Sequence, residues 1–398
     1  MLKPKIAILM SGGVDSSVSA LLLKKKKFDL TGVYLNCSNF CNPQDEEDAR
    51  RVAYKIDIPF YSFDLTQEFN EKVIDYLIET YKKGMTPNPD VYCNQFIKFG
   101  IFFEKALNLD FDFIASGHYA KTSKIIKSKN NNFSLVEDLK KISQFKNNET
   151  ILTKSRDKNK DQTYFLWKVN KENLKRLIFP VGGLLKSEVK KIAKRNNLEV
   201  ANKRESMGIC FVGKVKLKEF LGKYIKSKEG KIIDSKGRIL GTHPGYFYFT
   251  EGQRHGLNIK VGDGPYYVAY KIPEENLVVV AKENDPILFS KKIKIDEINI
   301  LTLNIFKKIY TQNQEKIKKY DNLYKKIPIN PKKSFIAYTR FRHRQPLVKA
   351  KIDLKNKIVE FEEPQKMISP GQAIVFYKNK TVLGGAIITQ TDIEKKII

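Results

Sequence analysis

The sequence has few cysteines and no long apolar run, and both shortages narrow the class of protein. No apolar stretch reaches the roughly 18 residues that a membrane-spanning helix needs. The N-terminal residues lack the basic, apolar and small-residue pattern of a signal peptide. The 398 residues include only 4 cysteines, so structural disulfides are not expected. We therefore expect a cytoplasmic protein without membrane contact, whose cysteines are reactive or buried thiols.

Acidic residues are scarce relative to basic ones. The chain has 73 Lys and Arg residues against 44 Asp and Glu residues, a formal net charge of +29. Such an excess is the electrostatic signature of a protein that binds a polyanion. Lysine far outnumbers arginine, and asparagine and isoleucine are also abundant, so a coding bias is a second explanation. Charge alone thus favours nucleic acid as a partner, with a generally solvated lysine surface as the alternative.

Length and periodicity predict two or three domains. The first half alternates apolar runs with helical patterns, which is typical of a doubly wound parallel sheet in an α/β domain. The strands predicted there cover residues 6–10, 30–35, 60–63 and 113–116, and the helices 16–26, 44–56, 66–83, 95–107 and 186–196. Ligands bind beyond the carboxyl ends of such strands.

The second half changes texture after Gly208, where short alternating segments are bounded by Gly, Asp or Pro. Strands are predicted at residues 231–240, 266–271, 276–281, 334–338, 347–353, 358–362, 373–377 and 381–388. Short strands at this spacing indicate a small C-terminal β-barrel after a small central domain. We place the domains at 1–203, 204–282 and 283–398. Lys- and Asn-rich stretches at 124–148 and 307–326 are interpreted as insertions, the first with a hairpin.

One loop between a predicted strand and helix combines glycines, hydroxyls and a carboxylate. It reads Ser11-Gly12-Gly13-Val14-Asp15-Ser16-Ser17. Glycines before a helix N-terminus let backbone N–H groups approach an anion, so the loop is typical of a phosphate cradle. It is not the mononucleotide P-loop, because no Gly-Lys-[Ser/Thr] follows. Asp15 would repel phosphate unless a divalent cation lay between them, which predicts Mg²⁺. A plain strand–helix connection is the alternative.

Two further segments place a cysteine near prolines, which stiffen the backbone, or near glycines, which leave it flexible. Cys93 follows a segment with two prolines, and Asp90 precedes it by three residues, so one helical turn would set both on one side. A basic environment would lower the pKa of such a thiol and activate it. Cys210 lies between Gly208 and Gly213. A buried structural cysteine is the alternative in each segment.

The string Ser-Gly-Gly-Val-Asp-Ser resembles the PP-loop of ATP pyrophosphatases, which adenylate an oxygen and release pyrophosphate. With the other motifs, the chain resembles the tRNA-specific 2-thiouridylase family from residue 5 to about residue 388. The motifs that carry the resemblance occur in order at 11–16, 87–94, 116–119, 160–166, 179–182, 208–211, 252–257 and 369–373. The resemblance implies ATP-dependent formation of 2-thiouridine at the wobble position, with sulfur carried as a cysteine persulfide.

The resemblance also implies residue roles. Cys93 would be the nucleophile, Cys210 the persulfide carrier and Asp90 a general acid or base. ATP would be held by Leu9, Met10, Ser11, Gly12, Gly13, Val14, Asp15, Ser16, Leu35 and Gly117. tRNA would be contacted by Asn88, Pro89, Asp90, His118, Lys160, Asp161, Gln162, Arg340, Phe341 and Gln372. Phe341 stands where the family pattern has tyrosine, a change that keeps stacking and loses a hydroxyl.

The implied partners are ATP with Mg²⁺, tRNAs that accept Lys, Glu and Gln, and a cysteine desulfurase or sulfur-relay protein. We expect the chain to be a monomer. Adenylation would make the uracil C2 oxygen a good leaving group, and the base would leave its stack to react. Whether the persulfide attacks C2 directly or Cys93 first releases sulfide stays open.

Cys37 and Cys41 depart from the family pattern. Their spacing is a weak metal signal, so a metal or cluster site with Cys93 and ordinary thiols both stay open. The competing functions are a PP-loop sulfur transferase for another tRNA base and a tRNA-binding chaperone with a vestigial loop. An amide-forming synthetase is disfavoured, because no glutaminase domain is present and the cysteine motifs would have no purpose.

Overall fold

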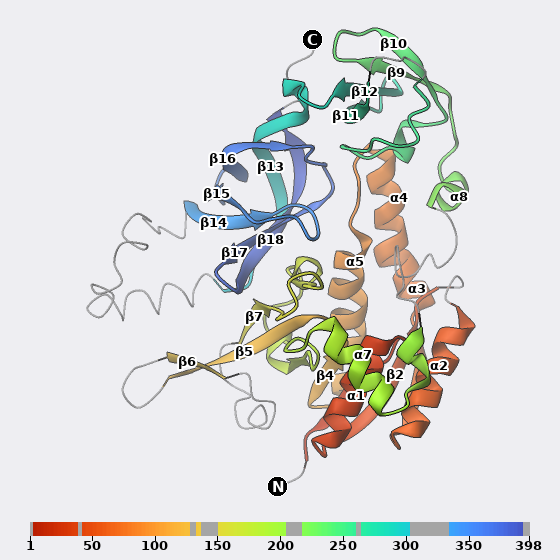
Figure 1. The fold of residues 1–398 in the computed structure, drawn as a ribbon, viewed down its shortest axis with the longest axis vertical. Helices are drawn as coiled ribbons and strands as arrows, with labels where there is room; N and C mark the ends of the chain where they lie inside the picture. The colour runs from red at the N-terminus through yellow and green to blue at the C-terminus, as the bar shows by residue number, and fades with distance from the viewer. Residues whose placement is uncertain are drawn as a thin grey trace, which may run out of the picture.

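The computed structural model describes residues 3–38, 42–127, 133–136, 150–203, 217–259, 264–302 and 334–392, which form three β-sheets (Figure 1). Cys41, Cys210 and the predicted insertion at 307–326 lie outside the described residues. Within the described ranges, no helix is both long and apolar enough to cross a membrane.

The first sheet is parallel and belongs to the N-terminal half. Its strands, in spatial order, are β3 (Phe60–Asp64), β2 (Asp29–Asn36), β1 (Lys5–Leu9), β4 (Phe113–Ser116) and β8 (Leu177–Ile178). All adjacent strands run parallel. Ile6 and Ile8 of β1 belong to one hydrophobic cluster and Ala7 and Leu9 to another, because successive side chains point to opposite faces. The predicted doubly wound sheet is confirmed.

Helices cover both faces of this sheet. Those that share a cluster with Ile6 and Ile8 are α1 (Val14–Lys25), α2 (Pro43–Lys55) and α7 (Lys186–Arg195). The helices that share the other cluster, with Ala7 and Leu9, are α3 (Thr66–Phe69), the π-helical η1 (Asn70–Ile74), α4 (Asp75–Lys82), α5 (Pro89–Tyr92), the π-helical η2 (Cys93–Ile101) and α6 (Phe102–Asn108).

The helix formed by α5, η2 and α6 begins earlier than predicted. It was predicted over 95–107, but it begins at Pro89 and continues through η2 into α6. The two prolines indicated a rigid turn, yet Pro89 occupies the first helical position, where a missing N–H costs nothing. Cys93 therefore lies on a helix.

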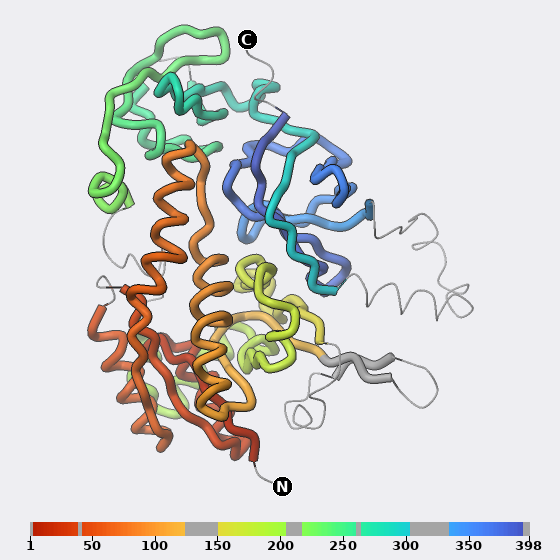
Figure 2. The backbone as a smooth tube through the Cα atoms, turned by 180° about the vertical axis from the view of Figure 1, so that it is seen from behind, coloured from red at the N-terminus to blue at the C-terminus, as the bar shows by residue number. Residues whose placement is uncertain are grey.

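This helical layer also reaches the central part of the chain, as the orange tube in Figure 2 shows. The Tyr246 hydroxyl donates a hydrogen bond to the Lys82 carbonyl at the end of α4. A Cβ at Gly84 would lie 2.4 Å from the Pro273 side chain, so the contact is close.

The second sheet has the strand order β10-β9-β12-β11. It comprises β9 (Gly230–Asp234), β10 (Ile239–His243), β11 (Tyr266–Ile272) and β12 (Leu277–Lys282), and follows α8 (Leu217–Gly222). The single strand predicted over 231–240 is wrong. It is a hairpin, because a turn with Gly237 at φ 81° separates β9 from β10. The central pair β12–β9 is parallel, whereas antiparallel strands were expected.

The third sheet contains the predicted C-terminal barrel. Its members are β13 (Phe289–Ile300), β16 (Ile358–Lys366), β15 (Val348–Asp353), β14 (Ser334–Arg340), β17 (Ala373–Lys378) and β18 (Thr381–Thr391). Pairing of β13 with both β16 and β18 closes these strands into an antiparallel barrel. All of its strands except β13 were predicted.

The barrel sheet continues into the N-terminal half. After β18 come β7 (Thr150–Lys154), β5 (Ala120–Lys127) and β6 (Phe133–Val136). The predicted hairpin of the first insertion is present, since β5 and β6 pair antiparallel. Short 3-10 turns complete the described chain: η4 (Thr163–Phe165), η5 (Asn173–Arg176), η6 (Glu199–Asn202), η7 (Tyr246–Tyr248) and η8 (Pro286–Leu288).

Candidate functional site

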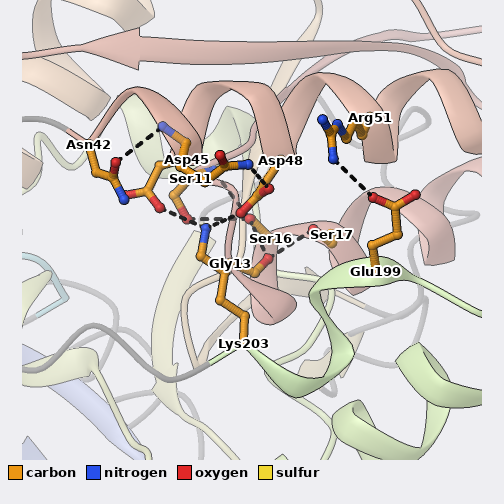
Figure 3. Close-up of polar contacts among 11 residues, drawn as sticks. Ser11, Gly13, Ser16, Ser17, Asn42, Asp45, Asp48, Arg51, Glu199 and Lys203 are labelled. Atoms are coloured by element: carbon orange, nitrogen blue, oxygen red, sulfur yellow. Dashed lines mark hydrogen bonds and ion pairs between the residues drawn. The ribbon is translucent and has the colours of Figure 1, made fainter.

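The glycine loop forms an open helix N-terminus at the carboxyl end of β1 (Figure 3). Gly12 has φ 67°, and a Cβ there would lie 2.1 Å from the Asp45 carbonyl oxygen. Gly13 is the N-cap of α1, and no side chain caps the helix. Because the first N–H groups of a helix have no partner within it, they can bind an anion here. The loop thus fits a phosphate group.

The serine hydroxyls brace this loop. Ser16 Oγ and Ser17 Oγ donate to the Gly13 carbonyl at 3.0 and 2.9 Å. The Ser11 backbone N–H donates to Ser16 Oγ at 3.2 Å. These hydroxyls therefore hold the loop in shape.

Asp15 has a cationic partner that the sequence analysis did not find. Lys186 Nζ donates to Asp15 Oδ1 and Oδ2 at 2.7 and 2.8 Å, and the Tyr119 hydroxyl donates to Oδ1 at 2.9 Å. The Lys186 side chain is 11% exposed. Lys186 therefore balances the charge that led to the prediction of Mg²⁺ at Asp15. The only sequence signal for it was its place four residues after the motif at 179–182.

A second set of ion pairs fixes the elements around the loop (Figure 3). Lys203 Nζ donates to Asp45 Oδ1 at 2.7 Å and also pairs with Asp48 of α2. Partial burial opposes the charge of Lys203, but the two carboxylates outweigh burial and raise its pKa. Arg51 pairs with Glu199 of η6 at 3.9 Å. α2 is thereby held against the chain that follows α7.

The ends of three strands meet at this loop. Leu9 of β1 pairs in register with Val33 of β2 and Ser116 of β4. Leu35 lies near the end of β2 and packs against the same cluster as Leu9. A Cβ at Gly117 would lie 2.6 Å from the Ser16 backbone nitrogen, so glycine is required where β4 ends against α1. Met10 continues β1 and hydrogen-bonds to Val33.

His118 follows Gly117 and is half-buried between aromatic rings. Phe99 and Phe179 have ring centroids 5.8 and 6.1 Å from the imidazole. Burial, with a contribution from Lys98, holds the pKa of His118 well below its usual value. Its Nδ1 is 2.8 Å from Ser116 Oγ. The ring is therefore neutral at pH 7.

Cys93 and Asp90 lie one turn apart at the start of the same helix. Asn88 is the N-cap of α5, Pro89 is its first residue and Asp90 is half-buried. Cys93 begins η2 and is 4% exposed. Cys37, after β2, is buried in the same hydrophobic cluster. Over the residues described, no group of three or more His, Cys, Asp and Glu side chains could hold a metal ion.

Residues just before β17 of the barrel bind the segment that precedes the helix of Cys93. Gln372 Nε2 donates to the carbonyls of Thr86 and Pro87 at 3.1 and 3.0 Å. The Thr86 N–H donates to the Pro370 carbonyl at 2.8 Å. Gly371, at φ 90°, would place a Cβ 2.7 Å from the Thr86 carbonyl oxygen. Gln372 was predicted as a tRNA contact, and its amide N–H groups are used within the protein.

A buried ion pair completes this junction. Lys271 Nζ lies 3.2 Å from Glu251 Oε1, and their side chains are 1% and 4% exposed. Lys271 also donates to the Phe249 carbonyl at 2.8 Å. Arg342 of the barrel donates to the Glu251 carbonyl at 2.8 Å. The central sheet, the barrel and the Thr86 segment therefore meet at one charged cluster, which sequence reasoning missed.

The predicted tRNA residues 160–162 and 340–341 lie together where β7 meets the barrel. Arg340 Nη1 donates to Asp161 Oδ2 at 3.2 Å. Gln162 Oε1 accepts from the Tyr119 N–H at 2.8 Å. Lys160 is half-buried in the same segment.

Phe341 does not offer its ring to RNA. The side chain is 2% exposed and packs edge-on against Phe361 with centroids 5.6 Å apart. The expectation of stacking is corrected accordingly, because a ring inside the barrel core cannot contact a base in this conformation.

Comparison with known proteins decides the family. The matching family models are described as tRNA methyl transferase HUP domain over 4–214, tRNA methyl transferase PRC-barrel domain over 218–282 and aminomethyltransferase beta-barrel domain over 316–388. The tRNA-specific 2-thiouridylase MnmA 1 of Geobacillus kaustophilus (strain HTA426) is 38% identical, over 98% of this chain and 96% of its own. The chain belongs to the tRNA-specific 2-thiouridylase MnmA family.

Another member of the MnmA family shows the same full-length agreement. The tRNA-specific 2-thiouridylase MnmA of Karelsulcia muelleri (strain GWSS) is 38% identical, over 97% of this chain and 99% of its own. The resemblance found from the motifs is confirmed over the whole length, including the segments that the structure does not describe.

Proposed function

We propose that this protein forms 2-thiouridine at the wobble position of tRNA, with ATP as the activating nucleotide and a cysteine persulfide as the sulfur carrier. The observation that carries the proposal is the open N-terminus of α1 beside Gly117. It belongs to the same layered domain as the helix of Asp90 and Cys93. An anion site and a thiol on one scaffold suit a reaction that first activates an oxygen and then replaces it.

The nucleotide-binding residues follow from the loop geometry. The free N–H groups at the start of α1 would hold phosphate, and Lys186 would keep Asp15 from repelling it. The ends of β1, β2 and β4, with Leu9, Leu35 and Gly117, would contact the nucleoside. Mg²⁺ would then be bound through phosphate oxygens, since the Asp15 carboxylate already accepts three hydrogen bonds.

The thiol residues would transfer the sulfur. ATP, when bound, supplies an adenylyl group that makes the C2 oxygen of uridine a leaving group. The terminal sulfur of a Cys210 persulfide would attack C2 while the C2–O bond breaks. The Cys93 thiolate would then attack Cys210 Sγ, which leaves the sulfur on C2 and forms a Cys93–Cys210 disulfide. A thiol reductant would restore both cysteines. Alternatively, Cys93 releases the sulfur first as hydrosulfide, which attacks C2.

The remaining assignments of the MnmA family extend this proposal. The Asn88-Pro89-Asp90 segment would contact the target base, with Asp90 as a general acid or base. His118 and Lys160 would contact tRNA, and the clamp of Gln372 would position the target-base segment. We further propose a cytoplasmic monomer of three units, 1–203, 204–282 and 283–398. It would act on Lys, Glu and Gln tRNAs with sulfur from a cysteine desulfurase or relay protein.

The test uses purified protein, an unmodified tRNA transcript, ATP and a persulfide donor, with mass spectrometry of nucleosides. C93S and C210S should each abolish 2-thiouridine but keep adenylation of the tRNA, read as pyrophosphate release, and D15A should lower that adenylation. C37S is the matched control, a buried thiol on the same cluster, and should thiolate normally. Thiolation by C93S or C210S at the rate of the unsubstituted protein would refute the two-thiol reaction. tRNA binding without ATP turnover would support the chaperone function instead.

A further inference from the structure

Two cations share one aromatic ring where β7 meets the barrel. Lys154, the last residue of β7, places Nζ 4.6 Å from the ring centroid of Tyr377 in β17. Arg340, the last residue of β14, places its guanidinium 5.6 Å from the same centroid. Tyr377 is fully buried, so its ring is a fixed platform. Like charges held this close repel each other unless anions neutralise them.

Among the described residues, Asp161 is the one carboxylate that faces both cations, and it is already engaged. Asp161 Oδ2 accepts from Arg340 Nη1 at 3.2 Å. Asp161 Oδ1 accepts from the Thr163 hydroxyl at 3.0 Å and from the Ser155 N–H at 3.3 Å. None of the carboxylates in the described ranges forms an ion pair with Lys154, and Arg340 Nε is buried without a hydrogen-bond acceptor there. The cluster therefore has one positive charge more than it can neutralise.

Two poorly exposed lysines of the sites described above are paired. Lys186 has Asp15 and Lys271 has Glu251. Lys154 differs, because partial burial lowers its pKa to about 8, with Asp161 opposing and Arg340 adding to the shift. The groups that face it are Asp161, Arg340 and Tyr377, and its ladder partner on β5 is the uncharged Ala120. A bound anion would remove the cost of its charge.

We propose that Lys154, together with Arg340, binds a phosphate group of the RNA backbone. The inference rests on the proposed function, which makes RNA the polyanion. β7 belongs to the N-terminal half and β14 and β17 to the barrel. One phosphate at this seam would be held from both halves, so RNA binding would fix their relative position.

The test measures binding of a fluorescein-labelled tRNA transcript to the full chain by anisotropy, over a salt series at pH 7. K154M should weaken binding and reduce the slope of log K against log salt by about 0.7 to 0.9, the loss of one phosphate contact. K154R should keep the slope. K349M is the matched control, because Lys349 is paired with Glu362 at 2.7 Å on the same barrel. An equal effect of K349M would reduce the result to general charge and overturn the proposal.

A pH series provides a second readout. Affinity of the unsubstituted protein should fall as pH rises from 7 to 9, because deprotonated Lys154 no longer attracts phosphate. K154R should show a smaller fall, since arginine stays charged over this range. This comparison stands even if K154M fails to fold, which its melting temperature reports. A pH dependence that K154R leaves unchanged would overturn the role of the Lys154 charge in RNA binding.

The outcomes separate this site from the proposed function. tRNA binding with an unaltered slope in K154M overturns the phosphate contact and leaves 2-thiouridine formation in place. Absence of tRNA binding by the unsubstituted protein overturns the function itself. Calorimetry with inorganic phosphate is the last arm. Phosphate binding that K154M abolishes without any change in tRNA affinity would show a small-anion site and refute an RNA contact.

Discussion

Removal of Lys271 tests how the three parts of the chain are joined. K271M leaves Glu251 buried at 4% side-chain exposure without its cation 3.2 Å away. Loss of one partner from such a pair costs about 3 to 5 kcal/mol, because water cannot reach the remaining charge. The folded variant can instead protonate the glutamate. For a glutamate of ordinary pKa, this protonation costs about 3.7 kcal/mol at pH 7. Both routes give the same magnitude, a large part of the roughly 5 to 15 kcal/mol that stabilises a domain.

The assay is guanidinium unfolding followed by the fluorescence of Trp167, the single and fully buried tryptophan. The midpoint for K271M should fall strongly at pH 7. The loss should shrink by up to about 1.4 kcal/mol per pH unit toward pH 5, since the folded variant then gains the proton that neutralises Glu251. The double variant E251L/K271M should regain most of the stability, because an apolar pair leaves no charge unpaired. A loss below about 1 kcal/mol in K271M, or no recovery in the double variant, would refute this reasoning.

Three further outcomes follow from other contacts. K186M should weaken ATP binding about tenfold or more, since an uncompensated Asp15 repels phosphate; equal affinities by calorimetry would contradict the role of Lys186. G117A should lower ATP affinity and cost about 1 to 3 kcal/mol, whereas G183A, with open space around its Cβ, should do neither; melting temperatures and ATP titrations decide. His118 is neutral when folded and gains a proton when unfolded below its usual pKa of about 6.5, so stability should fall from pH 7 to 5, and less steeply in H118Q; parallel curves would rule this out.

Local patterns predicted the parallel sheet and most of the barrel strands. The apolar runs of β1, β2 and β4 stand out because both of their faces are buried. The helix of Cys93 was placed too late, since proline indicates a turn and a first helical position equally well. β13 was missed because the alternation around the buried Ile293 and Ile295 is broken on each side by two consecutive exposed residues. The short β8 has only two residues and gives no period to detect.

Site residues that lie close together in the sequence were predicted, and those that meet only in the folded protein were missed. The glycine loop, Asp90 and Cys93 are adjacent to their neighbours in sequence, so motif and spacing identify them. Lys186 lies 171 residues from Asp15, and Lys154 meets Arg340 only because β7 joins the barrel sheet. Such pairs have neither a sequence period nor a fixed spacing from which they could be predicted.

The sequence by itself determined the layered sheet, the phosphate loop and the family, since each depends on side-chain alternation, glycine conformation or contiguous motifs. Only the tertiary structure decided which charges neutralise one another. It paired Asp15 with Lys186, turned Gln372 inward to the Thr86 segment and buried the ring of Phe341. The physical reason is that a charge or a ring acquires its role from what surrounds it after folding, and those neighbours come from distant parts of the chain.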